Sequence, residues 1–69
     1  MRRFNSLVGK RVQASYRAGD IHLTAAGILV EDSGESISIE ERFSQGGKEK
    51  MMRVEIPYSR VIHITEAGS

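Results

Sequence analysis

A chain of 69 residues has room for one small domain, and its composition limits how that domain can be stabilised. It contains no cysteine, which excludes disulfides and thiolate metal sites, and its two histidines have no familiar ligand spacing. The formal net charge of +1 favours no particular class of partner. Because so short a chain buries only about 60% of its unfolded surface, self-association is the support that remains. We therefore predict one domain over residues 1–69 that forms a homo-oligomer.

Residues 1–8 predict a short N-terminal helix or arm. Phe4, Leu7 and Val8 fall at helical spacing, and Gly9 follows where such a helix would end. The segment is too short to be stable alone. We therefore expect it to lay its apolar side chains over an open end of the remaining fold.

The next two segments alternate apolar and polar side chains, as half-buried strands do. The first strand covers residues 10–17, and the second has an apolar face from Ile21 to Leu29. Gly27 lies within this face, where a glycine usually marks a bend, a bulge or a close approach of another backbone. A strand bent at its middle can belong to both halves of a small barrel.

The rest of the chain predicts three more strands with tight connections. We expect a turn at 32–35, a strand from Ile37 to Phe43, a glycine-rich loop at 45–48, a strand from Met52 to Ile56, a turn at 58–60, a strand at 61–64 and a frayed tail at 66–69. Five short strands joined in this way predict an all-β, SH3-like barrel.

Charge is unevenly distributed along the chain. Residues 1–17 carry five basic groups and no acidic one, residues 18–42 carry six acidic groups against one basic, and residues 43–60 carry four basic groups against two acidic. One interpretation is that neighbouring strands carry complementary charges across a solvated face. The other is that the basic groups form one surface that binds phosphate.

Three segments resemble the Sm-like family, which includes the LSm and Hfq proteins. They are residues 8–12, which open the first strand, residues 27–29 in the second, and residues 54–64 at the end of the chain. The same segments are similar to the C-terminal domain of the bacterial ribosome-maturation factor RimP. The resemblance covers residues 7–64 and implies five strongly bent strands in a barrel, behind a short N-terminal helix.

The resemblance also implies an RNA-binding role for two turns. In Sm-like proteins an Asp and an Asn between strands two and three help to grip a base, and Asp32 stands here without the Asn. A basic motif lies near the turn between strands four and five, where this chain has Tyr58 and Arg60. An aromatic ring can stack on a base and a guanidinium can hold a phosphate, although Tyr58 could equally cap the barrel while Arg60 pairs with an acidic neighbour.

Self-association would add to any such binding, because a ring repeats the charges of Arg2 and Arg3 in every subunit. In Sm-like rings the fourth strand of one subunit pairs with the fifth strand of its neighbour. The resemblance therefore implies an oligomer interface formed by the apolar residues of these two strands, Met52, Val54, Ile56, Val61, Ile62 and Ile64.

The sequence favours a binding protein over an enzyme. Glu40 and Glu41 point to opposite faces of a strand, and no nucleophile motif is present, so we expect no catalysis, no cofactor and no metal. No apolar run approaches the roughly 20 residues of a membrane span, and a cytoplasmic location fits. Our leading hypothesis is an RNA-binding module that works as a ring-shaped homo-oligomer. The alternative is a protein-interaction or assembly module that uses an exposed strand edge without nucleic acid.

Overall fold

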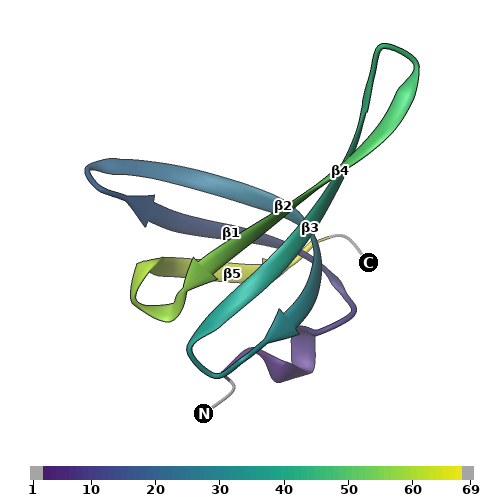
Figure 1. Cartoon of the computed structure of the whole chain (residues 1–69). Helices are drawn as coiled ribbons and strands as arrows, with labels where there is room; N and C mark the ends of the chain where they lie inside the picture. Colours follow the sequence, from purple (N-terminus) through teal and green to yellow (C-terminus); the bar gives the residue numbers. More distant parts are fainter. Residues whose placement is uncertain (1–2, 68–69) are drawn as a thin grey trace.

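The structure of the chain is a computed structural model that describes residues 3–67 (Figure 1). Its elements, in chain order, are η1 (Asn5–Leu7), β1 (Arg11–Ala18), β2 (Ile21–Asp32), β3 (Ser36–Gln45), β4 (Lys48–Pro57), η2 (Tyr58–Arg60) and β5 (Val61–Glu66). The described part of the chain has no α-helix, and η1 and η2 are single 3₁₀ turns. Thus no helix in it is suited to crossing a membrane. The predicted all-β class with five strands is confirmed.

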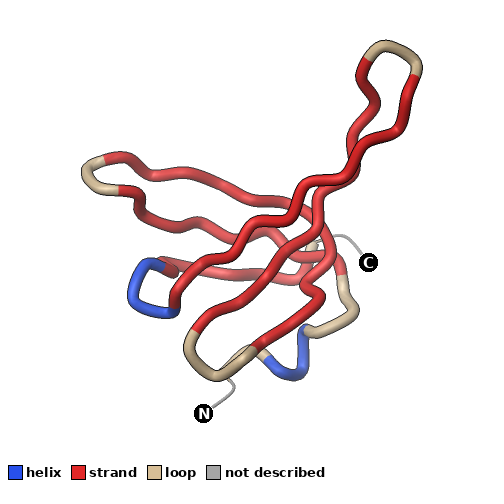
Figure 2. Tube along the Cα trace, viewed as in Figure 1, coloured by secondary structure: helices blue, strands red, loops and turns tan. Residues whose placement is uncertain are grey.

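The five strands form one antiparallel sheet in the order β4-β3-β2-β1-β5. β4 and β5 are therefore its two edges, and residues 3–67 contain no ladder between them. The expected strongly bent barrel, closed or partly open, is not formed: the sheet is neither closed, since closure requires such a ladder, nor strongly curled. Instead the β1–β2 and β3–β4 hairpins extend in different directions, as Figures 1 and 2 show.

β2 joins the two halves of the sheet. Residues 21–28 of β2 pair with β1, whereas its last part, from Ile28 to Asp32, pairs with β3. The register with β3 shifts between Leu29 and Glu31, so one extra residue of β2 forms a bulge there. As predicted for the second strand, a single long strand belongs to both halves of the molecule.

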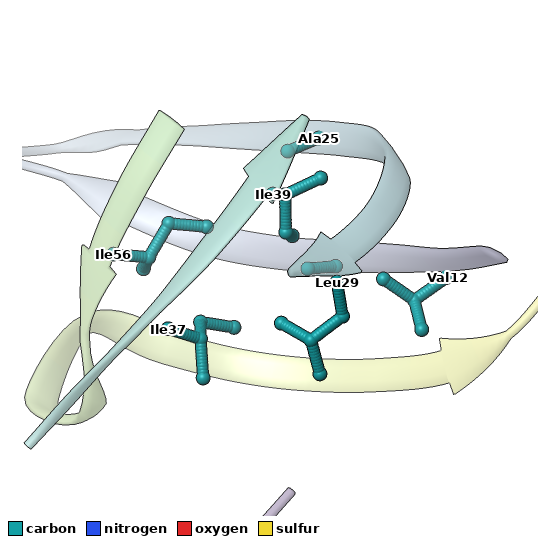
Figure 3. Packing of buried hydrophobic residues seen from close by; sticks show 7 residues of the cluster. Val12, Ala25, Leu29, Ile37, Ile39 and Ile56 are labelled. Atoms are coloured by element: carbon teal, nitrogen blue, oxygen red, sulfur yellow. The ribbon is translucent and has the colours of Figure 1, made fainter. Parts of the chain in front are cut away.

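The core lies between these two halves, and Figure 3 shows its side chains. Its members come from β1, β2, β3 and β4: Val12, Ala14, Ala25, Leu29, Ile37, Ile39 and Ile56. Each follows from the period-two pattern of its strand, since alternate residues of a strand face the same side. Each fully buried Val, Leu or Ile side chain contributes about 1.5–3 kcal/mol, so this small set supplies most of the hydrophobic stabilisation.

A close backbone approach at Gly27 lets the two halves meet. A Cβ atom at this position would lie 2.0 Å from the backbone oxygen of Glu40 and 3.2 Å from a methyl carbon of Ile39. Just before this point β2 has no partner in β3, and the Glu41 carboxylate accepts a hydrogen bond from the Ala26 N–H at 2.9 Å. Of the three features that a strand glycine was expected to mark (a bend, a bulge or a close backbone approach), the structure shows the close approach.

We predict that Gly27→Ala destabilises the protein by about 1–3 kcal/mol or more, because backbone atoms rather than a flexible side chain must move to admit the methyl group. Ala26→Ser is the matched control, since residue 26 is exposed on the same strand. Urea unfolding of the two variants measures the difference. Equal free energies of unfolding would show that β3 does not constrain this position.

Candidate nucleic-acid interface

Three of the predicted binding residues lie together at one end of the molecule. Asp32 ends β2, Tyr58 begins η2, and Arg3 precedes η1. Arg60 is exposed in the same turn as Tyr58, while Arg2 lies outside the described residues. Sequence positions separated by more than 50 residues thus meet, because the Arg3 N–H donates a hydrogen bond of 3.0 Å to the Tyr58 hydroxyl.

Asp32 holds this end of the molecule together. Its side chain is buried, and its carboxylate accepts hydrogen bonds from the Phe4 N–H at 2.8 Å, the Gly34 N–H at 2.9 Å and the Tyr58 hydroxyl. Gly34 has a φ of 92°, a left-handed conformation that favours glycine. The Asp32 carboxylate therefore links the N-terminal arm, the β2–β3 turn and η2.

Tyr58 contacts two residues of the N-terminal arm, Arg3 and Phe4. Its half-buried ring meets the Phe4 ring with centroids 5.4 Å apart and planes at 81°, and the Arg3 guanidinium carbon lies 5.9 Å from its centroid. Its backbone N–H donates to the Glu35 carbonyl at 2.9 Å. Edge-to-face aromatic pairs and cation–π contacts are each worth about 0.5–1.5 kcal/mol, so these contacts orient the ring without locking it.

The same surroundings change the acidity of the Tyr58 hydroxyl. Its removal from water raises the pKa, and the hydrogen bond donated to Asp32 acts in the same direction. The backbone N–H of Arg3 opposes both effects. Tyr58 is therefore a neutral hydrogen-bond donor to Asp32 well into the alkaline range.

Three open hollows mark the surface. One of about 400 Å³ is lined by Arg3, Gly34, Tyr58 and Ser59. A second, of about 360 Å³, runs from Tyr58 along β5 at one edge of the sheet. A third, of about 340 Å³, lies elsewhere, where β2 and β3 separate, and brings together four polar side chains that were not predicted to bind a ligand: Arg11, Gln13, Glu40 and Arg42.

The sequence analysis also missed two contributors to the Tyr58 end. Phe4 was expected only as apolar cover, yet its N–H and its ring both belong to the cluster. Gly34 contributes a backbone N–H rather than a side chain. The available signal was the Asp-Ser-Gly turn sequence, in which an Asp side chain often accepts the N–H two residues ahead.

The six residues predicted for an oligomer interface fall into two groups. Ile56 is a core residue with 1% exposure, and Val54, Val61 and Ile64 pack against the core, so these four side chains serve the chain's own fold. Met52 on β4 and Ile62 on β5 are 47% and 48% exposed. Each edge strand thus presents one large apolar side chain from the predicted set to solvent.

Ion pairs account for part of the uneven charge distribution. Arg53 of β4 bonds Glu31 of β2 at 3.1 Å, and Lys10 approaches Glu66 of β5 at 3.7 Å. Arg42 lies 3.9 Å from Glu49 across the β3–β4 hairpin. The Arg42–Glu49 contact joins neighbouring strands, whereas the Arg53–Glu31 contact spans β3, and each of these exposed contacts stabilises the fold by at most about 1 kcal/mol.

Comparison with known protein families, with characterised proteins and with solved structures finds no match to this chain. Among residues 3–67, no group of three or more His, Cys, Asp or Glu side chains is placed to hold a metal ion. The geometry of the Tyr58 end and of the two sheet edges therefore carries the functional argument.

We predict that the protein loses stability at alkaline pH when Tyr58 ionises. Because its folded pKa lies above the ordinary value of 10.0, its contribution to stability is complete below pH 10.0 and is lost as the pH rises through the folded pKa. Urea unfolding over this window should show a decline that is smaller in Tyr58→Phe, with tyrosinate absorbance reporting ionisation. Ionisation of Tyr58 at or below pH 10.0 would contradict the prediction.

Proposed function

We propose that the protein is a non-catalytic RNA-binding module that works as a homo-oligomer. The observation that carries the proposal is that Arg3 and Tyr58 line an open hollow at one end of the sheet, with the exposed Arg60 in the same 3₁₀ turn as Tyr58. Aromatic rings stack on unpaired bases, and guanidinium groups bind phosphates or base edges. These stacking and phosphate contacts require no particular RNA sequence, because every base has a face that can stack.

The arrangement of elements supports an Sm-like architecture within this proposal. A helical turn precedes the first strand, five antiparallel strands follow, and a short 3₁₀ turn joins the last two strands. These are the parts that the resemblance to Sm-like proteins implies. The open sheet differs from the bent barrel of that family, so the proposal rests on the Tyr58 end and the sheet edges.

The two unpaired edges support self-association within this proposal. β4 and β5 each expose a row of backbone N–H and C=O groups, which other strands can pair with. Because the two edges differ, pairing β4 of one copy with β5 of the next is a head-to-tail contact, and such contacts form rings when the rotation closes. Repetition would multiply weak phosphate contacts.

The second candidate is a protein-interaction or assembly module without nucleic acid. The observation in its favour is the exposed apolar surface of the edge strands, where Met51, Met52 and Ile62 are 58%, 47% and 48% exposed. Exposed apolar residues beside an unpaired strand edge suit strand addition by a partner. Salt dependence separates the two candidates, since phosphate contacts weaken steeply with salt and apolar contacts do not.

We predict that single-stranded RNA binds with an affinity that falls steeply as salt is added, and that Arg60→Ala weakens binding and reduces the salt slope by about one. Lys48→Ala is the matched control, because Lys48 is an exposed cation at the far end of the β3–β4 hairpin. Fluorescence anisotropy over a salt series measures both. Binding that is absent or insensitive to salt would favour the second candidate.

We predict that Ile62→Asp gives monomers or insoluble protein, because a carboxylate on the β5 edge must be desolvated when another strand pairs there. Val8→Asp is the control, since Val8 is 38% exposed and lies outside the strands. Native mass measurement reports the number of subunits. An unchanged, soluble oligomer of Ile62→Asp would exclude pairing through this edge.

A further inference from the structure

We propose that Arg3 and Phe4 form a strap that competes with RNA for Tyr58 and Asp32. The inference rests on the proposed function, since it concerns how access to the same binding surface is controlled. In the structure the strap is closed: both of its residues contact Tyr58, and Phe4 also contacts Asp32. RNA would bind Tyr58 only when the strap has been displaced.

Hydrogen bonding is the first reason for competition. Two consecutive backbone N–H groups of the strap are used, one donating to the Tyr58 hydroxyl at 3.0 Å and the other to the Asp32 carboxylate at 2.8 Å. The N–H groups of a nucleobase edge are donors of the same kind. While the strap is closed, these two oxygens already accept hydrogen bonds from Arg3 and Phe4. A base that donates to them would have to replace those donors.

Ring contacts are the second reason. The Arg3 guanidinium lies over the Tyr58 ring with its carbon 5.9 Å from the centroid, and the Phe4 ring meets Tyr58 at an interplanar angle of 81°. A base that stacks on the ring face over which Arg3 lies has to displace the guanidinium. Arg3 must therefore swing aside, after which its cationic group remains beside the bound strand.

Few contacts hold the strap closed, so little free energy is needed to open it. Arg3 is exposed, and Phe4 is half-buried against the core. When only a fraction of molecules is open, the apparent dissociation constant is the intrinsic constant divided by that fraction. Loosening Phe4 while keeping Arg3 should therefore tighten RNA binding, which is the opposite of what a simple loss of contact surface would do.

The test compares Phe4→Ala with Leu7→Ala. Both variants remove a half-buried apolar side chain near the N-terminus that packs against the core, but Phe4→Ala also removes the ring that meets Tyr58 edge to face. The probe is a fluorescently labelled oligouridylate of roughly ten nucleotides, a length within the site sizes of single-strand-binding proteins. Phe4→Ala should bind it roughly threefold to tenfold more tightly than the parent, which is the fold-change in affinity that the free energy of one aromatic pair corresponds to. Leu7→Ala should bind it no more tightly than the parent.

A second readout follows the strap without RNA. In a Tyr16→Phe background Tyr58 is the only tyrosine, so quenching of its fluorescence by acrylamide measures its exposure. Quenching should increase in Phe4→Ala and stay unchanged in Leu7→Ala. This measurement also shows whether Phe4→Ala remains folded with its strap open.

The outcomes separate the strap from the proposed function. Unchanged or weaker binding by Phe4→Ala, with Tyr58 more exposed and the parent protein binding normally, would overturn the strap and leave the proposed function intact. Unchanged quenching would also overturn it, because Phe4 would then not control access to Tyr58. If neither protein binds oligouridylate, the proposed function fails and the competition fails with it.

Discussion

The absence of a side chain at Gly27 is the constraint on which the rest of the structure depends. The backbone of β3 at Glu40 occupies the space that a Cβ atom would need. Because β3 can come this close, β2 pairs with β1 along its first part and with β3 along its last part. The two hairpins then place their apolar faces around one core, and both ends of the sheet are left as unpaired edges.

The end of β2 turns this architecture into a candidate site. Asp32 closes the strand with a carboxylate that is buried but fully engaged, and its donors come from three different segments. The carboxylate therefore organises the surface around Tyr58 and is not simply one of its contacts. In the proposed function, RNA access would be coupled to the position of Arg3 and Phe4, because these residues already donate hydrogen bonds to the Tyr58 and Asp32 oxygens.

Much of this could be predicted from local pattern, and the failures have physical causes. Period-two alternation located the strands, and β4 ends at Pro57, which has no N–H to donate. Barrel closure was not predictable in this way, since it depends on whether two distant edges meet. Apolar alternation also cannot distinguish Ile56, which the core buries, from Ile62, which it leaves exposed.

The sequence by itself determined which segments form strands and turns, though not all of their bounds, and it offered a close approach as one of three explanations of the strand glycine, because these features depend on neighbouring residues and on backbone sterics. It also singled out Arg3, Tyr58 and Arg60 as candidates from the chemistry of their side chains, and Asp32 from the resemblance to Sm-like proteins. Only the tertiary structure decided that Arg3 and Phe4 lie against Tyr58, and that Asp32 accepts hydrogen bonds from Phe4 near the start of the chain and from Tyr58 near its end. These contacts join residues up to 55 positions apart, and their energies exist only once the sheet has brought the segments together.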